Sequence, residues 1–242
     1  MIIDAHTHVH RVPGSFWDSP PERLLALMEE AGVEKSVIMS YGGAPAEVSI
    51  DYIDECVRKY PGKFIGYANI NLAEEKDPCG LLRHAIEDLG FKGLKLHPVA
   101  YHMLPAHESS LELLKEAGRL GVPALFHCGD EEYTMPLQIA EAAALAPGTT
   151  FILGHMGGYF HCADALKAAE HHANIMLETS AMPYPSVIRE AVKLLGAARV
   201  IFASDGPGCP PHLDAEKVRC AGLSSAEEAC LFHGNIERLH GA

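Results

Sequence analysis

Apolar runs with strand character alternate with helix-type patterns along the whole chain of 242 residues. Strands are expected near 2–6, 36–40, 63–69, 92–97, 122–127, 149–154, 174–178 and 199–204, and helices near 20–31, 47–59, 79–89, 109–119, 135–146, 160–171 and 185–195. A helical tail follows over about 212–239, with a break at Gly222. Strands that alternate with helices pair in parallel through right-handed crossovers, and closure into a barrel removes both sheet edges. The sequence therefore predicts an α/β fold, a (β/α)8 TIM barrel with a C-terminal helical tail, as a single domain over residues 1–242.

An open, doubly wound parallel sheet is the competing architecture for such a pattern. That fold places a glycine-rich phosphate loop directly after its first strand. This chain carries His6 and His8 at that place, so the pattern favours the barrel.

These two histidines end the first strand and are one residue apart. Side chains alternate between the two faces of a strand, so His6 and His8 point to the same side. Two neutral imidazoles that converge at a strand end make half of a transition-metal site. A polar strand end or a metal-free turn is the alternative for the pair taken alone.

Later strands carry ligand-type side chains at their carboxyl ends. These residues are His97, His127, His155 and Asp205. In a parallel barrel those ends meet on one face, where the active sites of such barrels lie. His127 could instead be a barrel histidine bonded to backbone, and Asp205 could cap the turn that follows it.

The composition narrows the classes of partner. The net charge of −13 argues against nucleic-acid or anionic-membrane binding, since both need clustered Lys and Arg, and it favours a small-molecule substrate. No apolar stretch approaches the roughly 20 residues that span a bilayer, and no basic segment precedes the first strand, so a cytoplasmic protein is expected. The seven cysteines include no C-x-x-C pair, and we expect them to be reduced and packed.

The order His-x-His, then His, His and Asp at later strand ends resembles the amidohydrolase superfamily. The closer resemblance is to its amidohydrolase-2 type, the small metal-dependent TIM-barrel hydrolases and nonoxidative decarboxylases. It extends from Asp4-Ala-His-Thr-His to the segment His-Gly-Asn-Ile-Glu-Arg-Leu at 233–239. It implies four metal ligands, which are His6, His8, His127 and Asp205. It also implies one divalent ion, zinc first and manganese second, and less readily a second metal.

The implied chemistry uses this ligand set directly. A divalent cation lowers the pKa of its bound water, and Asp205 can both bind the ion and take the proton as that water attacks a carbonyl. His155 would act beside the metal as a general acid/base or as a further ligand. Asp205 and His155 are therefore the expected catalytic residues.

Lys95 and His97 share the inward face of the fourth strand. In superfamily members with two metals, a carboxylated lysine on this strand bridges the ions, and Lys95 could be that residue. We expect instead that Lys95 or His97 holds a substrate carboxylate. A structural pairing of Lys95 with a barrel acid such as Asp4 is the third alternative.

Further residues have weaker assignments. Arg11 could clamp a substrate carboxylate or be a solvated loop residue. Trp17 and Tyr41 could wall the pocket, and Glu178 could orient a ligand histidine or form a core salt bridge. Among the remaining histidines, those nearest to a functional assignment are His10 and His161.

Three functions remain open at this point. The leading one is a hydrolase in which a metal-activated water cleaves an ester, lactone or amide, and the short chain favours it. The alternative is a nonoxidative decarboxylase of a small unsaturated or aromatic carboxylic acid, and the second alternative is a catalytically inactive binding barrel. A homo-oligomer is a further expectation.

Overall fold

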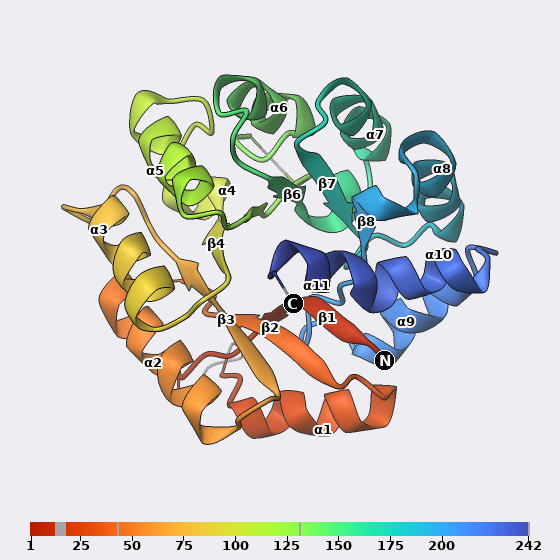
Figure 1. Ribbon diagram of the computed structural model, residues 1–242, viewed down its shortest axis with the longest axis horizontal. Coiled ribbons are helices and arrows are strands. Elements are labelled where there is room, and N and C mark those ends of the chain that lie inside the picture. Colours follow the sequence, from red (N-terminus) through yellow and green to blue (C-terminus); the bar gives the residue numbers. More distant parts are fainter. Residues whose placement is uncertain (13–17, 43, 131, 242) are drawn as a thin grey trace.

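The computed structural model describes residues 1–12, 18–42, 44–130 and 132–241, and it confirms the predicted (β/α)8 TIM barrel (Figure 1). The eight strands are β1 (Ile3–His8), β2 (Lys35–Met39), β3 (Phe64–Asn69), β4 (Gly93–Leu96), β5 (Ala124–Phe126), β6 (Phe151–Leu153), β7 (Ile175–Glu178) and β8 (Val200–Ile201). They lie in sequence order and every neighbouring pair is parallel.

Backbone hydrogen bonds between β1 and the segment that follows β8 close the barrel. Ala5 N–H donates to the Phe202 carbonyl at 3.2 Å, Asp205 N–H to the His6 carbonyl at 2.8 Å, and His8 N–H to the Gly206 carbonyl at 2.7 Å. β8 itself is only two residues long, shorter than the predicted 199–204. Four residues after β8, Asp205 adopts a left-handed backbone conformation, with φ 64°.

Helices surround the barrel, and the last of them lies across its middle in the view of Figure 1. They are α1 (Pro21–Ala31), α2 (Ala46–Lys59), α3 (Pro78–Arg83) with the π-helix His84–Asp88, α4 (Pro98–Tyr101), α5 (Glu108–Arg119), α6 (Pro136–Leu145), α7 (Cys162–His171), α8 (Pro185–Leu195), α9 (Pro211–Arg219), α10 (Ser225–Ala229) and α11 (Asn235–Leu239). Short 3-10 turns cover Gly154–Gly157 and Ala197–Arg199, and a second π-helix covers Cys230–Gly234. The short α4 was not predicted, although Pro98 at its first position is a helix-start signal.

The barrel interior is apolar at its amino end and polar at its carboxyl end. The buried apolar residues inside are Ile3, Ala5, Val37, Met39, Tyr67, Leu125, Ile152, Met176, Ile201, Ala203 and Ile236. Tyr67 fills space beside Gly93, where a Cβ would lie 2.4 Å from the tyrosine ring. This filled amino end leaves the carboxyl ends of the strands as the place where polar side chains converge. Within the described ranges, no helix is long and apolar enough to cross a membrane.

Candidate active site

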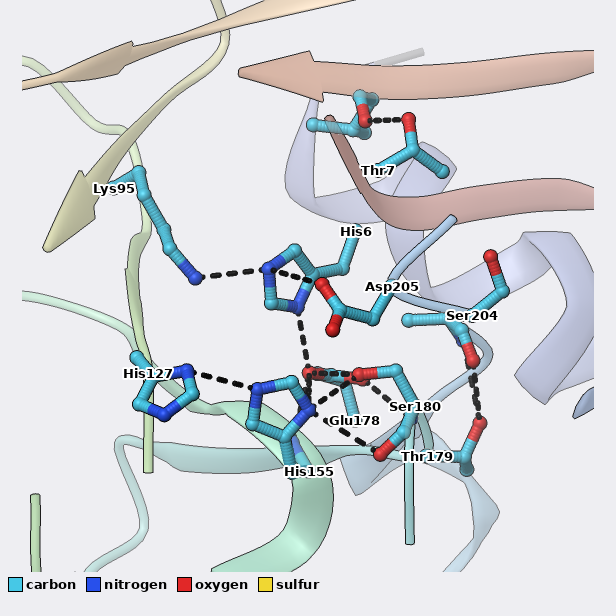
Figure 2. A network of polar contacts seen from close by, with 12 residues as sticks. His6, Thr7, Lys95, His127, His155, Glu178, Thr179, Ser180, Ser204 and Asp205 are labelled. Atoms are coloured by element: carbon cyan, nitrogen blue, oxygen red, sulfur yellow. Dashed lines mark hydrogen bonds and ion pairs between the residues drawn. The ribbon is translucent and has the colours of Figure 1, made fainter. Parts of the chain in front are cut away.

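The end of β1 brings two imidazoles and a carboxylate together. The pairing of β1 with β2 shifts register between Asp4 and Thr7, and such irregularities re-aim side chains near active sites. Asp205 Oδ1 lies 3.6 Å from His6 Nε2 and 3.1 Å from His8 Nε2 (Figure 2 shows His6 and Asp205). His6, His8 and Asp205 form one of two groups of metal-ligand type whose ligand atoms lie within 4.8 Å of one another in the described chain.

This arrangement fits a divalent cation. Two ligands bound tetrahedrally at about 2.1 Å lie about 3.4 Å apart, close to the observed separations. A cationic group already lies there, because Lys95 Nζ is 2.8 Å from His6 Nε2 (Figure 2). Lys95 is 1% exposed and contacts His6, not Asp4, which is hydrogen-bonded to Ser204. A metal ion and the Lys95 ammonium compete for the same imidazole lone pair.

Glu178, the last residue of β7, orients the cluster of His6, His8 and Asp205 through hydrogen bonds. Its Oε1 accepts hydrogen bonds from His6 Nδ1 at 2.9 Å, from the His155 backbone N–H at 2.8 Å and from the hydroxyl of Ser180 at 2.9 Å. His6 therefore carries its proton on Nδ1 and presents Nε2 to Asp205. Glu178 thus contacts His6, which agrees with both alternatives stated for it, the orientation of a ligand histidine and a salt bridge in the core. Together with His6 and His155, Glu178 forms the second group of metal-ligand type.

His155 lies in the turn after β6 with φ 60°, in the left-handed region. Its Nδ1 faces the Ser180 hydroxyl at 2.8 Å, and its Nε2 lies 3.1 Å from His127 Nδ1 (Figure 2). His127 Nε2 in turn contacts the carboxylate of Asp130. His155 and Asp205 both have left-handed backbone conformations, and strained backbone of this kind is common at functional sites. The expected ligand His127 thus lies beside His155 but outside both groups of metal-ligand type.

Burial sets the charge states of the cluster. It lowers the pKa of His6, His8 and His155, so these rings are neutral near pH 7, and it lowers the pKa of Lys95 to about 8. Burial opposes ionisation of Asp205, but the hydrogen bond from His8 and the adjacent imidazoles outweigh it and hold its pKa well below the usual range. The site is therefore an ionised carboxylate among neutral imidazoles, which is a donor set suited to a divalent ion.

Two ring stacks frame the cluster. His97 stacks on His127 with centroids 4.0 Å apart, and Tyr41 stacks on His8 at the same separation. Burial first, and then the neighbouring His127, lower the pKa of His97 to about 2, so this ring is neutral. The side chains of Asp205 and His127 are 26% and 16% exposed, whereas His6 is fully buried, so the cluster opens to solvent past these two residues.

Other sequence-predicted residues lie elsewhere. Arg11 is exposed and lines a cavity of about 340 Å³ with Asp18, Glu22, Tyr52 and Glu55, among others, none of which belongs to the cluster. Trp17 lies outside the described residues. His10 pairs with Ser19 through backbone hydrogen bonds, and His161 precedes α7.

The cysteines follow the prediction only in part. All seven are free thiols, but Cys56 and Cys128 alone are buried, and Cys220 is exposed.

Two polar residues that contact the site, Ser180 and Asp130, were not predicted from the sequence. Ser180 is two residues beyond Glu178, a spacing that places side chains on one face of an extended segment. Asp130 is three residues after His127 in the loop after β5. The only clue to either residue in the sequence is its short spacing from Glu178 or His127.

Comparison with known proteins gives the family. The family model described as Amidohydrolase matches residues 3–242. No curated protein sequence matches the chain.

Solved structures match along almost their full lengths. The 2,6-dihydroxybenzoate decarboxylase from Rhizobium is 17% identical with a TM-score of 0.77, and the match covers 99% of this chain and 98% of that one. The 5-carboxyvanillate decarboxylase from Sphingomonas paucimobilis is 16% identical with a TM-score of 0.76, at 99% and 98% coverage. The dihydroxybenzoic acid decarboxylase from Polaromonas sp. JS666, with bound manganese and 2-nitroresorcinol, is 18% identical with a TM-score of 0.78, at 99% and 96% coverage. At these identities the structural matches show a shared fold alone, and the family match shows that the chain belongs to the amidohydrolase family.

Proposed function

We propose that the protein is a metal-dependent nonoxidative decarboxylase of a small aromatic or unsaturated carboxylic acid. The observation that carries the proposal is the convergence of His6 Nε2, His8 Nε2 and Asp205 Oδ1 beside the buried ammonium of Lys95. The decarboxylases that share the fold support the choice of reaction. The short chain was expected to favour a hydrolase. The alignments, however, cover at least 96% of those decarboxylase chains, so chain length does not favour hydrolysis over decarboxylation.

The ligand set would be His6, His8, His127 and Asp205, the set that the resemblance to the amidohydrolase superfamily implies. Bound there, a divalent ion supplies positive charge to the substrate oxygens. Imidazole and carboxylate ligands suit both zinc and manganese, and the Polaromonas structure contains manganese. Lys95 offers a second cation, because its ammonium is buried beside His6 and a substrate carboxylate would give it a charge-assisted partner.

The reaction consumes one proton for each carboxylate lost, since R–CO2⁻ and H⁺ give R–H and CO2. Asp205 is placed to carry that proton, because its carboxylate is ionised and partly exposed at the mouth of the cluster. It can take a proton from a substrate hydroxyl or from water and return it to the carbon that loses CO2. His155, whose Nε2 faces His127, is the second group that we place in proton transfer. The stacked His97 and His127 offer a flat surface to a planar substrate.

The test is product analysis on protein loaded with manganese or zinc. The metal content is measured first, and the protein is then offered 2,6-dihydroxybenzoate and 5-carboxyvanillate in one series and lactones, esters and amides in another. We expect CO2 and the decarboxylated product in equal amounts. Asp205→Asn should lower kcat by at least about 10³-fold, while Asp51→Asn, at an exposed position on α2, should not change it. Turnover of the ester or amide series alone would overturn the proposal in favour of hydrolysis.

A further inference from the structure

Hydrogen-bond accounting fixes which nitrogen of His155 carries the proton. Three oxygen atoms surround Nδ1, namely the Ser180 hydroxyl at 2.8 Å, the Ser180 carbonyl at 3.3 Å and Glu178 Oε1 at 3.9 Å. A carbonyl can only accept, and the hydroxyl donates its own hydrogen to Glu178. Nδ1 is therefore the protonated nitrogen of His155, and Nε2 bears a lone pair that faces His127.

The same accounting applies to His127. Its Nε2 contacts the carboxylate of Asp130, and a carboxylate accepts hydrogen bonds but does not donate them. Nε2 must therefore carry a hydrogen, which leaves the Nδ1 of a neutral ring with a lone pair. The loop holds Asp130 in place for this contact, since its backbone N–H donates to the Thr134 hydroxyl at 3.2 Å.

In these tautomers the lone pairs of the two rings face each other. His155 Nε2 and His127 Nδ1 are 3.1 Å apart. When both rings are in the tautomers assigned above, these two nitrogens are both acceptors, and they repel unless a cation binds one of the lone pairs. A cation bound to His127 Nδ1 removes that repulsion and leaves His155 Nε2 free to accept a proton. The carboxyl end of the barrel thus presents unprotonated nitrogens of His6, His127 and His155 on the same side as Asp205.

We propose that Asp130 is a positioning residue of the metal site. By accepting the Nε2 hydrogen of His127, it holds that ring in the tautomer whose Nδ1 faces the metal. Asp130 thereby does for His127 what Glu178 does for His6. The inference rests on the metal site of the proposed function but not on the reaction, because it concerns only the tautomer and the affinity for the ion.

The chain offers a matched control for this pair. His161 and Asp164 are also three residues apart, with a 4.0 Å ion-pair contact, and both lie outside the cluster. The side chains of Asp164 and Asp130 are 48% and 58% exposed, so substitution of either is compatible with folding. Asp164→Asn therefore removes a comparable charge from a comparable His–Asp pair without touching the proposed site.

The first measurement is zinc affinity, by titration of the metal-stripped full-length protein. Asp130→Ala should raise the dissociation constant for zinc about 10- to 100-fold, the usual cost of removing a partner of a ligand histidine. Asp130→Asn keeps a carbonyl acceptor and should lose less zinc affinity than Asp130→Ala. Asp164→Asn should bind zinc with the wild-type dissociation constant. An unchanged dissociation constant in Asp130→Ala would overturn the proposal.

The second measurement is the ¹⁵N spectrum of the histidine rings in the zinc-loaded protein. We expect His127 to show a protonated Nε2 and an unprotonated Nδ1 in the wild type, and this pattern to weaken in Asp130→Ala. A protonated Nδ1 in the wild type would overturn the proposal whatever the enzyme catalyses. If both measurements agree with it while no CO2 is released from any acid, the positioning role stands and the proposed reaction fails.

Discussion

Glu178 Oε1 accepts a hydrogen bond from His6 Nδ1 at 2.9 Å, and neither side chain is exposed to solvent. The bond joins β7 to β1, the two strands on either side of β8. It fixes the ring of His6 with Nε2 toward Asp205 and Lys95, which is the orientation a metal ligand needs.

Glu178→Gln should weaken metal binding and destabilise the fold together. Glu178 receives four hydrogen bonds, three at Oε1 and one at Oε2 from the Ser180 N–H at 2.7 Å. A glutamine has one acceptor oxygen, so its amide N–H₂ would face one of these donors. We expect a loss of about 2 kcal/mol in urea denaturation and a 10- to 100-fold weaker affinity for zinc. Glu29→Gln, at an exposed position of α1, should change neither quantity.

Lys95→Met should separate metal binding from catalysis. The ammonium lies 2.8 Å from His6 Nε2 and competes with the ion for that lone pair, so its removal should tighten zinc binding about fivefold. The buried partner for a substrate carboxylate disappears at the same time, so kcat/KM should fall about 100-fold. Isothermal titration and initial-rate kinetics measure the two effects, with Lys76→Met as the exposed control.

Weaker metal binding by Lys95→Met would contradict this expectation. That result would instead indicate that Lys95 helps to hold the ion, as a carboxylated lysine would.

The sequence predicts the barrel because its signals are periodic and redundant. Each strand is an apolar run with a helix after it, so an error at one boundary does not change the topology. The short α4 was not predicted because four residues are too few to show a helical period. The strands β5 and β6 each end one residue earlier than predicted, and a 3-10 turn with His155 in the left-handed region directly follows β6.

Only part of the candidate site can be predicted from the sequence. His6, His8, His155 and Asp205 follow apolar runs, and the barrel necessarily gathers the residues at such positions. Asp130 lies in a loop whose conformation has no periodic signal, so its contact with His127 depends on the folded chain. Arg11 follows the metal motif in sequence, but in the folded chain it lines a cavity beside α1 and α2, in keeping with the alternative of a solvated loop residue.

Arg199→Met should destabilise the barrel without affecting the site. The guanidinium donates to the carbonyls of Ile175 at 2.7 Å, and of Ala169 and His172 at 2.9 Å each, where α7 gives way to β7. Removing it leaves partly buried carbonyls without a donor, at a cost of about 2 kcal/mol. Arg58→Met removes only an exposed pair with Asp54 and should cost less than about 0.5 kcal/mol. Urea denaturation compares the two variants, and equal losses would contradict the assignment.

His240 should make part of the stability depend on pH. Its Nε2 lies 2.9 Å from the hydroxyl of Tyr67 at the amino end of the barrel. Burial, and then Lys92, lower its pKa from 6.5 to about 4. Between those values the unfolded chain binds a proton that the folded chain does not. This contribution to stability is therefore complete above pH 6.5 and is lost as the pH falls toward 4.

His240→Gln isolates that contribution from those of the other buried histidines, which act in the same direction. Glutamine can still bond to the Tyr67 hydroxyl but does not titrate in this range. Urea denaturation at pH 7.5, 6.5, 5.5 and 4.5 should therefore show a shallower fall for the variant, by about 2 kcal/mol over the range. His212→Gln, at an exposed position of α9, should follow the wild-type curve. Parallel curves for His240→Gln and the wild type would mean that His240 titrates equally in both states, and that its burial against Tyr67 does not disfavour the protonated ring.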